Sequence, residues 1–174
     1  MRIQVLTFFF LAICLNTSAQ QINPFLNLRF DKVIICDYES DGEHSYPLVD
    51  KNWTLTKIVK KNTRIDKQTI STLNIKLGAK KSYGQVQAYC FEPHFGILYY
   101  KMNKVVAQIE ICLSCNVLFS SIEIPAQKQG KQGKGDKVYY LGNGMSKSFR
   151  KFINSIIKKY NFSHQIQPGS YFDK

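Results

Sequence analysis

The sequence predicts an α+β fold in which an antiparallel sheet is covered by an amphipathic C-terminal helix. Three consecutive strands are expected over residues 85–90, 95–100 and 105–111, because β-branched and aromatic residues are concentrated there and alternate with polar ones in the last. Residues 149–160 carry an apolar stripe at helical spacing, as a helix that packs on one face of a sheet requires.

Residues 1–19 have the features of a secretory signal peptide. Arg2 gives a basic start, residues 5–15 are apolar, and small residues at 17–19 suit signal peptidase. The apolar stretch is shorter than the roughly 20 residues that span a bilayer, and no later segment approaches that length. We therefore expect an exported chain, periplasmic or secreted, in which residues 20–174 form a single α+β domain.

The chain is strongly basic, with a formal net charge of +12. Such a balance can attract nucleic acid, anionic lipid or acidic polysaccharide, or it can reflect a solvated surface. The lysines are dispersed and basic-aromatic RNA-binding signatures are missing, so nucleic acid is not an expected partner and the solvated surface is favoured. An anionic surface or a protein partner is left open.

The first strand is expected within residues 28–38, which are rich in β-branched and aromatic side chains. Phe30, Ile34, Cys36 and Tyr38 recur there at period two, so they should share one face of the sheet.

A short strand and a helix are expected next. Trp53 and Leu55 indicate the strand, and Gly78 is placed to end a helix over residues 66–77. The apolar residues of that helix recur at helical spacing: Ile70, Leu73 and Leu77.

The strands over residues 95–100 and 105–111 are predicted to form a hairpin, with its turn near Met102 and Asn103. Opposed residues then have numbers that sum to about 205, which sets His94 level with Cys112 and Cys90 level with Cys115. Pro93 cannot donate to a strand ladder, so the pairing should loosen there.

Two further segments complete the chain. Residues 127–137 contain no apolar side chain and predict a mobile loop. Ser146 is the candidate N-cap of the final helix, with Lys147, Arg150 and Lys151 on its polar face. A membrane-surface helix is one interpretation of that pattern, but packing on the sheet is favoured because the strands need a cover.

The candidate functional site is a cluster of Cys90, His94, Cys112 and Cys115. Their spacing and the predicted hairpin bring all four to one end of the sheet. Three cysteines and one histidine are an established tetrahedral ligand set for structural zinc. The sequence therefore predicts a zinc site.

Disulfides are the main alternative for the same cysteines. An exported protein meets an oxidising compartment, so Cys90 can pair with Cys112 or Cys115 while Cys36 takes the other. A redox-active Cys112–Cys115 pair and inert reduced thiols are also open.

Other sequence features indicate no site. The acidic turn at residues 37–42 resembles the first half of a calcium loop, but Leu48 stands where a bidentate glutamate is needed. His44 and His164 lie in loop-like contexts without a nucleophile or paired carboxylate at meaningful spacing.

Two motifs carry a resemblance over the C-terminal half. Cys-Phe-Glu-Pro-His-Phe-Gly-Ile from Cys90, with Ile-Cys-Leu-Ser-Cys-Asn from Ile111, resembles a group of uncharacterised exported bacterial proteins. The resemblance implies no activity or cofactor. Two classes are therefore carried forward: an exported, non-catalytic binding or structural protein with a zinc cluster, and an envelope thiol- or metal-dependent enzyme that uses Cys112 and Cys115.

Overall fold

Strands that are far apart along the chain join in one antiparallel sheet. The computed structural model describes residues 22–40, 47–128, 130–134 and 139–173. Within these residues the sheet has seven strands in the order β2-β1-β4-β5-β6-β8-β7. They are β1 (Lys32–Tyr38), β2 (Val59–Arg64), β4 (Phe95–Lys101), β5 (Lys104–Cys112), β6 (Val117–Ser120), β7 (Gly130–Gln132) and β8 (Tyr139–Leu141).

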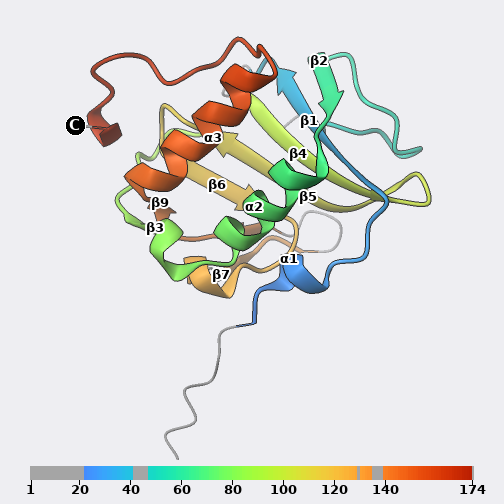
Figure 1. Ribbon diagram of the computed structural model, residues 1–174, viewed down its shortest axis with the longest axis horizontal. Helices are drawn as coiled ribbons and strands as arrows, with labels where there is room; N and C mark the ends of the chain where they lie inside the picture. Colours follow the sequence, from blue (N-terminus) through green and yellow to red (C-terminus); the bar gives the residue numbers. More distant parts are fainter. Residues whose placement is uncertain (1–21, 41–46, 129, 135–138, 174) are drawn as a thin grey trace, which may run out of the picture.

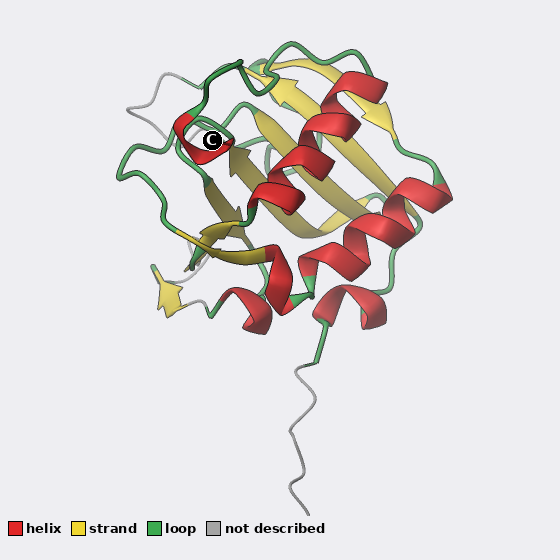
Figure 2. Ribbon diagram, turned by 60° about the vertical axis from the view of Figure 1, so that its left-hand side comes forward, coloured by secondary structure: helices red, strands yellow, loops and turns green. Residues whose placement is uncertain are grey.

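Two long helices cover one face of this sheet, as Figures 1 and 2 show. They are α2 (Lys67–Leu77) and α3 (Lys147–Lys159), and the short helix α1 (Pro24–Asn27) contacts α2. The main core forms where their apolar side chains meet those of the central strands: Leu73, Phe149, Ile153, Val33, Ile35, Ile97 and Ile109. This arrangement confirms the predicted α+β class and the C-terminal covering helix.

Short elements connect these layers. Strands β3 (Tyr83–Gln85) and β9 (Gly144–Met145) pair separately from the main sheet. Single turns of 3-10 helix lie at Lys80–Ser82, Pro125–Gln127 and Tyr171–Asp173. No helix in the described ranges is long and apolar enough to cross a bilayer.

α2 ends at Gly78 and α3 begins at Ser146, as the sequence predicts. The Asp66 carboxylate accepts a hydrogen bond from the Thr69 N–H at 2.9 Å, and Gly78 follows the last turn of α2. Ser146 caps α3 by accepting from the Phe149 N–H at 3.4 Å. The prediction of Arg150 on the polar face of α3 is wrong, because this side chain is fully buried.

The other face of the sheet has a smaller core. Cys36 and Tyr38 point there from β1 and pack with Leu98 of β4 and with Leu48. Burial raises the pKa of the Cys36 thiol to about 12, so this thiol is protonated at neutral pH. Phe30 precedes β1 and packs against the main core, so the predicted shared face does not extend to it.

The β4–β5 hairpin has the predicted turn and nearly the predicted register. Tyr100 opposes Val105 as expected, but a bulge next to Tyr99 shifts the pairing by one residue, and Phe95 then opposes Ile111. The bulge also turns Val105 toward the smaller core, away from the face that Ala107 shares with the helices.

Two predicted strands are wrong. The Asp50 carboxylate accepts from the backbone N–H groups of Asn52 and Thr54, which closes a turn, and the second strand starts later, at β2. Residues 86–90 leave β3 to meet the Cys112–Cys115 turn, where the Ala88 N–H donates to the Cys115 carbonyl at 2.8 Å.

Two expectations lie wholly or partly outside the described residues. The signal peptide at 1–19 is outside them, as are residues 129 and 135–138 of the expected mobile loop. Within that loop, residues 130–132 form β7, and the buried Gln127 side chain donates to the carbonyls of Leu118 and Asn143. Mobility of the loop stays a prediction.

Candidate metal centre

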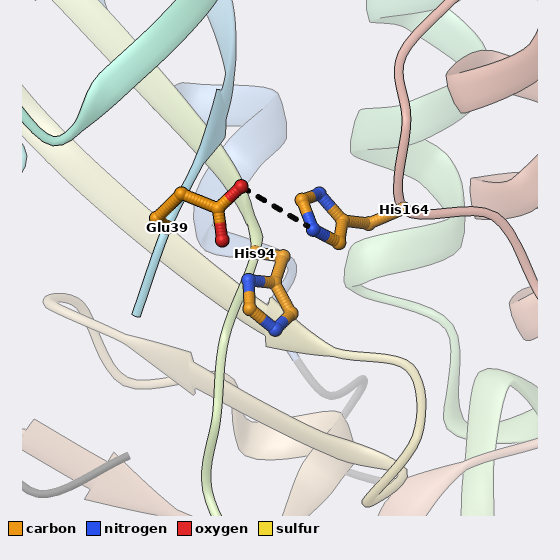
Figure 3. Close-up of side chains that lie close together, drawn as sticks. All are labelled: Glu39, His94 and His164. Carbon is orange, nitrogen blue, oxygen red and sulfur yellow. Dashed lines mark ion pairs between the residues drawn. The ribbon is translucent and has the colours of Figure 1, made fainter. Parts of the chain in front are cut away.

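Three segments meet at one edge of the sheet and bring together Glu39, His94 and His164. Glu39 follows β1, His94 precedes β4, and His164 lies beyond the end of α3. One potential ligand atom from each residue lies within 4.8 Å of the other two. Figure 3 shows the Glu39 carboxylate facing the His164 ring, with His94 beside them.

The end of β1 holds His94 in place. The Tyr38 N–H donates to the His94 carbonyl at 3.1 Å, which continues the strand pairing beyond β4. The Nδ1 atom of His94 lies 3.1 Å from the Tyr38 carbonyl oxygen. A carbonyl only accepts, so Nδ1 carries the proton in the neutral ring and Nε2 keeps a free lone pair.

Asp37 orients His164 in a similar way. Its Oδ1 lies 2.6 Å from His164 Nδ1, and its Oδ2 accepts from the Ser163 N–H at 2.9 Å. The Asp37 side chain is only 6% exposed, so both carboxylate oxygens are committed to this segment. A carboxylate behind a histidine Nδ1 is the usual orienting partner of a metal-binding imidazole.

The three side chains lie partly open to solvent. The rings of His94 and His164 stack at a centroid distance of 4.0 Å and an angle of 8°. His164 Nε2 lies 4.0 Å from Glu39 Oε1, and the Glu39 side chain is 59% exposed. Two imidazoles and one carboxylate in this arrangement can hold a metal ion.

The four residues of the predicted zinc cluster divide between two places. Cys90 and Cys115 form a disulfide, so neither is a thiolate ligand in this structure. Cys112 lies next to them, where its sulfur accepts from the Cys115 N–H at 3.2 Å. His94 instead stacks on His164. Zinc binding by all four residues in the reduced protein stays a prediction.

The disulfide alternative is right about one bridge and wrong about the second. Cys90 pairs with Cys115, one of its two expected partners, while Cys36 and Cys112 are free thiols. The reason is the strand order: β4 lies between β1 and β5, so Cys36 and Cys112 are separated by about two strand spacings, roughly 9.6 Å. That exceeds the reach of a disulfide.

Sequence reasoning missed Glu39 and His164. Glu39 belongs to the acidic turn at residues 37–42, in which the sequence indicates no site, and His164 has no nucleophile or paired carboxylate at a meaningful spacing. The only local hint is that β1 ends in an acidic run. The fold itself brings His164 to that run, through the segment that returns from α3.

Comparison of the chain with protein family models, with curated proteins and with solved structures finds no match. The resemblance to exported bacterial proteins therefore stays a prediction.

Proposed function

We propose that this is an exported, non-catalytic metal-binding protein in which Glu39, His94 and His164 hold one zinc ion. The observation that carries the proposal is the convergence of two histidines whose Nδ1 atoms already have acceptors. Two histidines and a glutamate are a known protein ligand set for zinc. The Asp37 carboxylate adds a second negative charge beside the ion.

The ion would act as a staple between distant parts of the chain. Its ligands come from the C-terminal end of β1, from the start of β4 and from the segment beyond α3. Because the unfolded chain cannot assemble these ligands, the free energy of binding would add to the free energy of unfolding.

Variants can separate this site from the predicted three-cysteine site. His94 belongs to both, so its replacement cannot distinguish them. We expect the full chain, purified without a histidine tag, to bind one equivalent of zinc with His164→Ala abolishing binding and Cys112→Ser leaving it unchanged. Titration calorimetry and metal analysis would measure both. Loss of binding in Cys112→Ser alone would place the zinc on the cysteines and overturn the proposal.

The Asp37 carboxylate behind His164 gives a quantitative prediction. Asp37→Asn should weaken zinc binding by about 10- to 100-fold, because the amide orients His164 less strongly and lowers its basicity. Glu123→Gln removes one negative charge from an exposed residue outside the ligand set and should leave the dissociation constant unchanged. Equal effects of the two changes would mean that only net charge matters.

An enzyme is the second candidate, because three protein ligands leave a coordination position open to water. Catalytic zinc sites have this arrangement, whereas structural ones usually have four protein ligands. Hydrolysis of 4-nitrophenyl acetate by the zinc-loaded chain, lost in His164→Ala, would favour this candidate. A rate equal to that of the variant would favour the non-catalytic staple.

A further inference from the structure

Three cysteines meet at the open end of the β4–β5 hairpin, and none of them belongs to the candidate metal centre. Cys115 is bonded to Cys90, and the thiol of Cys112 lies against the Cys115 backbone. A thiol beside a disulfide is the arrangement that thiol–disulfide exchange requires, because the thiolate attacks a disulfide sulfur directly.

A backbone N–H and a hydroxyl contact the Cys112 sulfur. The Cys115 N–H donates to it at 3.2 Å, and the Ser114 hydroxyl lies 3.2 Å away. The same hydroxyl lies 3.8 Å from the Cys115 sulfur. The Ser114 hydroxyl therefore contacts both sulfurs that would join.

Arg150 fixes the turn that contains this pair. Its Nη1 donates to the Leu113 carbonyl at 2.6 Å and to the Asn116 side-chain oxygen at 3.2 Å. Asn116 in turn donates to the carbonyls of Val86 and Met145. Arg150 and Asn116 therefore fix the backbone of the turn that contains Cys112 and Cys115.

Exposure differs between the three cysteines. Cys112 and Cys115 are each 1% exposed, whereas Cys90 lies on the surface beside the fully exposed Tyr89. A thiol on Cys112 is thus shielded from reagents, and a thiol on Cys90 is open to them.

We propose that Cys90, Cys112 and Cys115 form a thiol–disulfide exchange centre that presents Cys90 as a reactive surface thiol toward small-molecule disulfides of the glutathione disulfide class. The Cys112 thiolate attacks the Cys115 sulfur, the Cys112–Cys115 bond forms, and the Cys115–Cys90 bond breaks. The electron pair leaves on Cys90, which takes up the proton that Cys112 lost, so this step needs no oxidant or reductant.

The second step uses the small-molecule disulfide as its co-reactant. The Cys90 thiolate attacks one of its sulfurs, a mixed disulfide forms on Cys90, and the other half leaves as a thiolate. The balance again needs no further reagent. Because the centre does not involve Glu39 or His164, the test of this proposal is independent of zinc binding at those residues.

Trapping with N-ethylmaleimide tests the first step directly. The full chain, folded and without reductant, is treated with the reagent and mapped by non-reducing peptide mass spectrometry. We expect the label on Cys90 together with a Cys112–Cys115 disulfide. Incubation with glutathione disulfide should likewise place glutathione on Cys90.

Variants give the matched comparison. Cys112→Ala should lower the labelling of Cys90 at least tenfold, because the Cys90–Cys115 bond then has no internal attacker. Cys36→Ala also removes one buried thiol, but Cys36 lies in the smaller core and its replacement should leave Cys90 labelling unchanged.

The peptide maps of the unmodified chain decide the matter even if a variant fails to fold. Label on Cys112 with the Cys90–Cys115 bridge intact would overturn the proposal, and so would a folded chain that takes no label on Cys90.

Discussion

Arg150 joins the C-terminal helix to two other segments through a fully buried guanidinium group. It donates to Asp173 at 2.6 Å, to the Leu113 carbonyl at 2.6 Å and to the Asn116 side chain at 3.2 Å. Its positive charge holds the pKa of the Asp173 carboxyl below its usual range, mainly through their hydrogen bond. Arg150, which the sequence pattern assigns to the polar face of α3, therefore belongs to the protein interior.

We expect Arg150→Met to lower the free energy of unfolding by about 3–5 kcal/mol, since it leaves a carboxylate and buried acceptors without their partner. Lys151→Met is the matched control, because Lys151 is exposed on the same helix and its replacement should change stability by less than about 0.5 kcal/mol. Urea denaturation measures both. Similar values for the two variants would contradict the structural role of Arg150.

Glu110 shows the opposite electrostatic situation. Burial raises the pKa of its carboxyl, although hydrogen bonds from Gln108 at 2.7 Å and from Tyr38 at 2.9 Å oppose the shift. The folded-state pKa lies above the unfolded one, so the folded chain retains this proton to higher pH. The contribution of Glu110 to stability is therefore present at low pH and is lost as pH rises through its folded pKa.

Glu110→Gln removes this titration. The free energy of unfolding of the variant should fall less than that of the natural chain as pH rises from 4 to 8. The exposed Glu123→Gln variant should keep the original slope. Urea midpoints across this range would measure the difference, and parallel curves for all three proteins would contradict the assignment to Glu110.

At the scale of elements, the β4–β5 hairpin turns on two residues with left-handed backbone. Met102 has φ 47° and Asn103 has φ 62°, which is the pattern of a type I′ turn. A methionine in this conformation costs roughly 1–2 kcal/mol. The Met102 N–H also donates to Asp31 at 2.6 Å, and substitution of the side chain does not remove that contact.

Replacing the turn by Asn-Gly, through Met102→Asn with Asn103→Gly, should raise the free energy of unfolding by about 1 kcal/mol, because both residues tolerate positive φ. Met102→Ala keeps the unfavourable backbone and should give no gain. Thermal and urea denaturation would compare the three. Equal stability of both variants would show that the turn is not strained at Met102.

The same hairpin shows what sequence can predict. The position of the turn and the pairing of Tyr100 with Val105 follow from the alternation of apolar and polar residues and from the short segment between the two strands. The bulge does not, because one extra residue in β5 changes no local propensity and is fixed by how both faces of the sheet pack. The end of α2 and the start of α3 were predictable because Gly78 and Ser146 are typical of those positions.

At the scale of the whole molecule, the two candidate sites differ in how far apart their residues lie in sequence. Cys90 and Cys115 are 25 residues apart and flank one hairpin, so local pairing could bring them together. His164 reaches His94 only after α3 has packed on the sheet and its exit segment has met Asp37. Tertiary contacts of that kind have no signature in spacing.

The disulfide also connects the fold to the compartment in which the chain works. Cys90 is exposed, so a reducing environment would open its bridge, whereas an oxidising one would keep it. Closing a loop of this size contributes about 3 kcal/mol to the free energy of unfolding. We therefore expect the natural chain to be most stable in an oxidising compartment.

We expect the N-terminal segment, residues 1–19, to direct export of the chain and to be removed. Expression of the full chain in a bacterium should yield periplasmic or secreted protein whose N-terminal sequence begins at Gln20 or close by, since the apolar stretch ends in small residues up to Ala19. A chain that starts at Gln20 should stay in the cytoplasm with Cys90 and Cys115 reduced, and its midpoint of thermal unfolding should rise on oxidation. Exported protein that retains Met1 would contradict cleavage, and an unchanged midpoint would show that the bridge does not stabilise the fold.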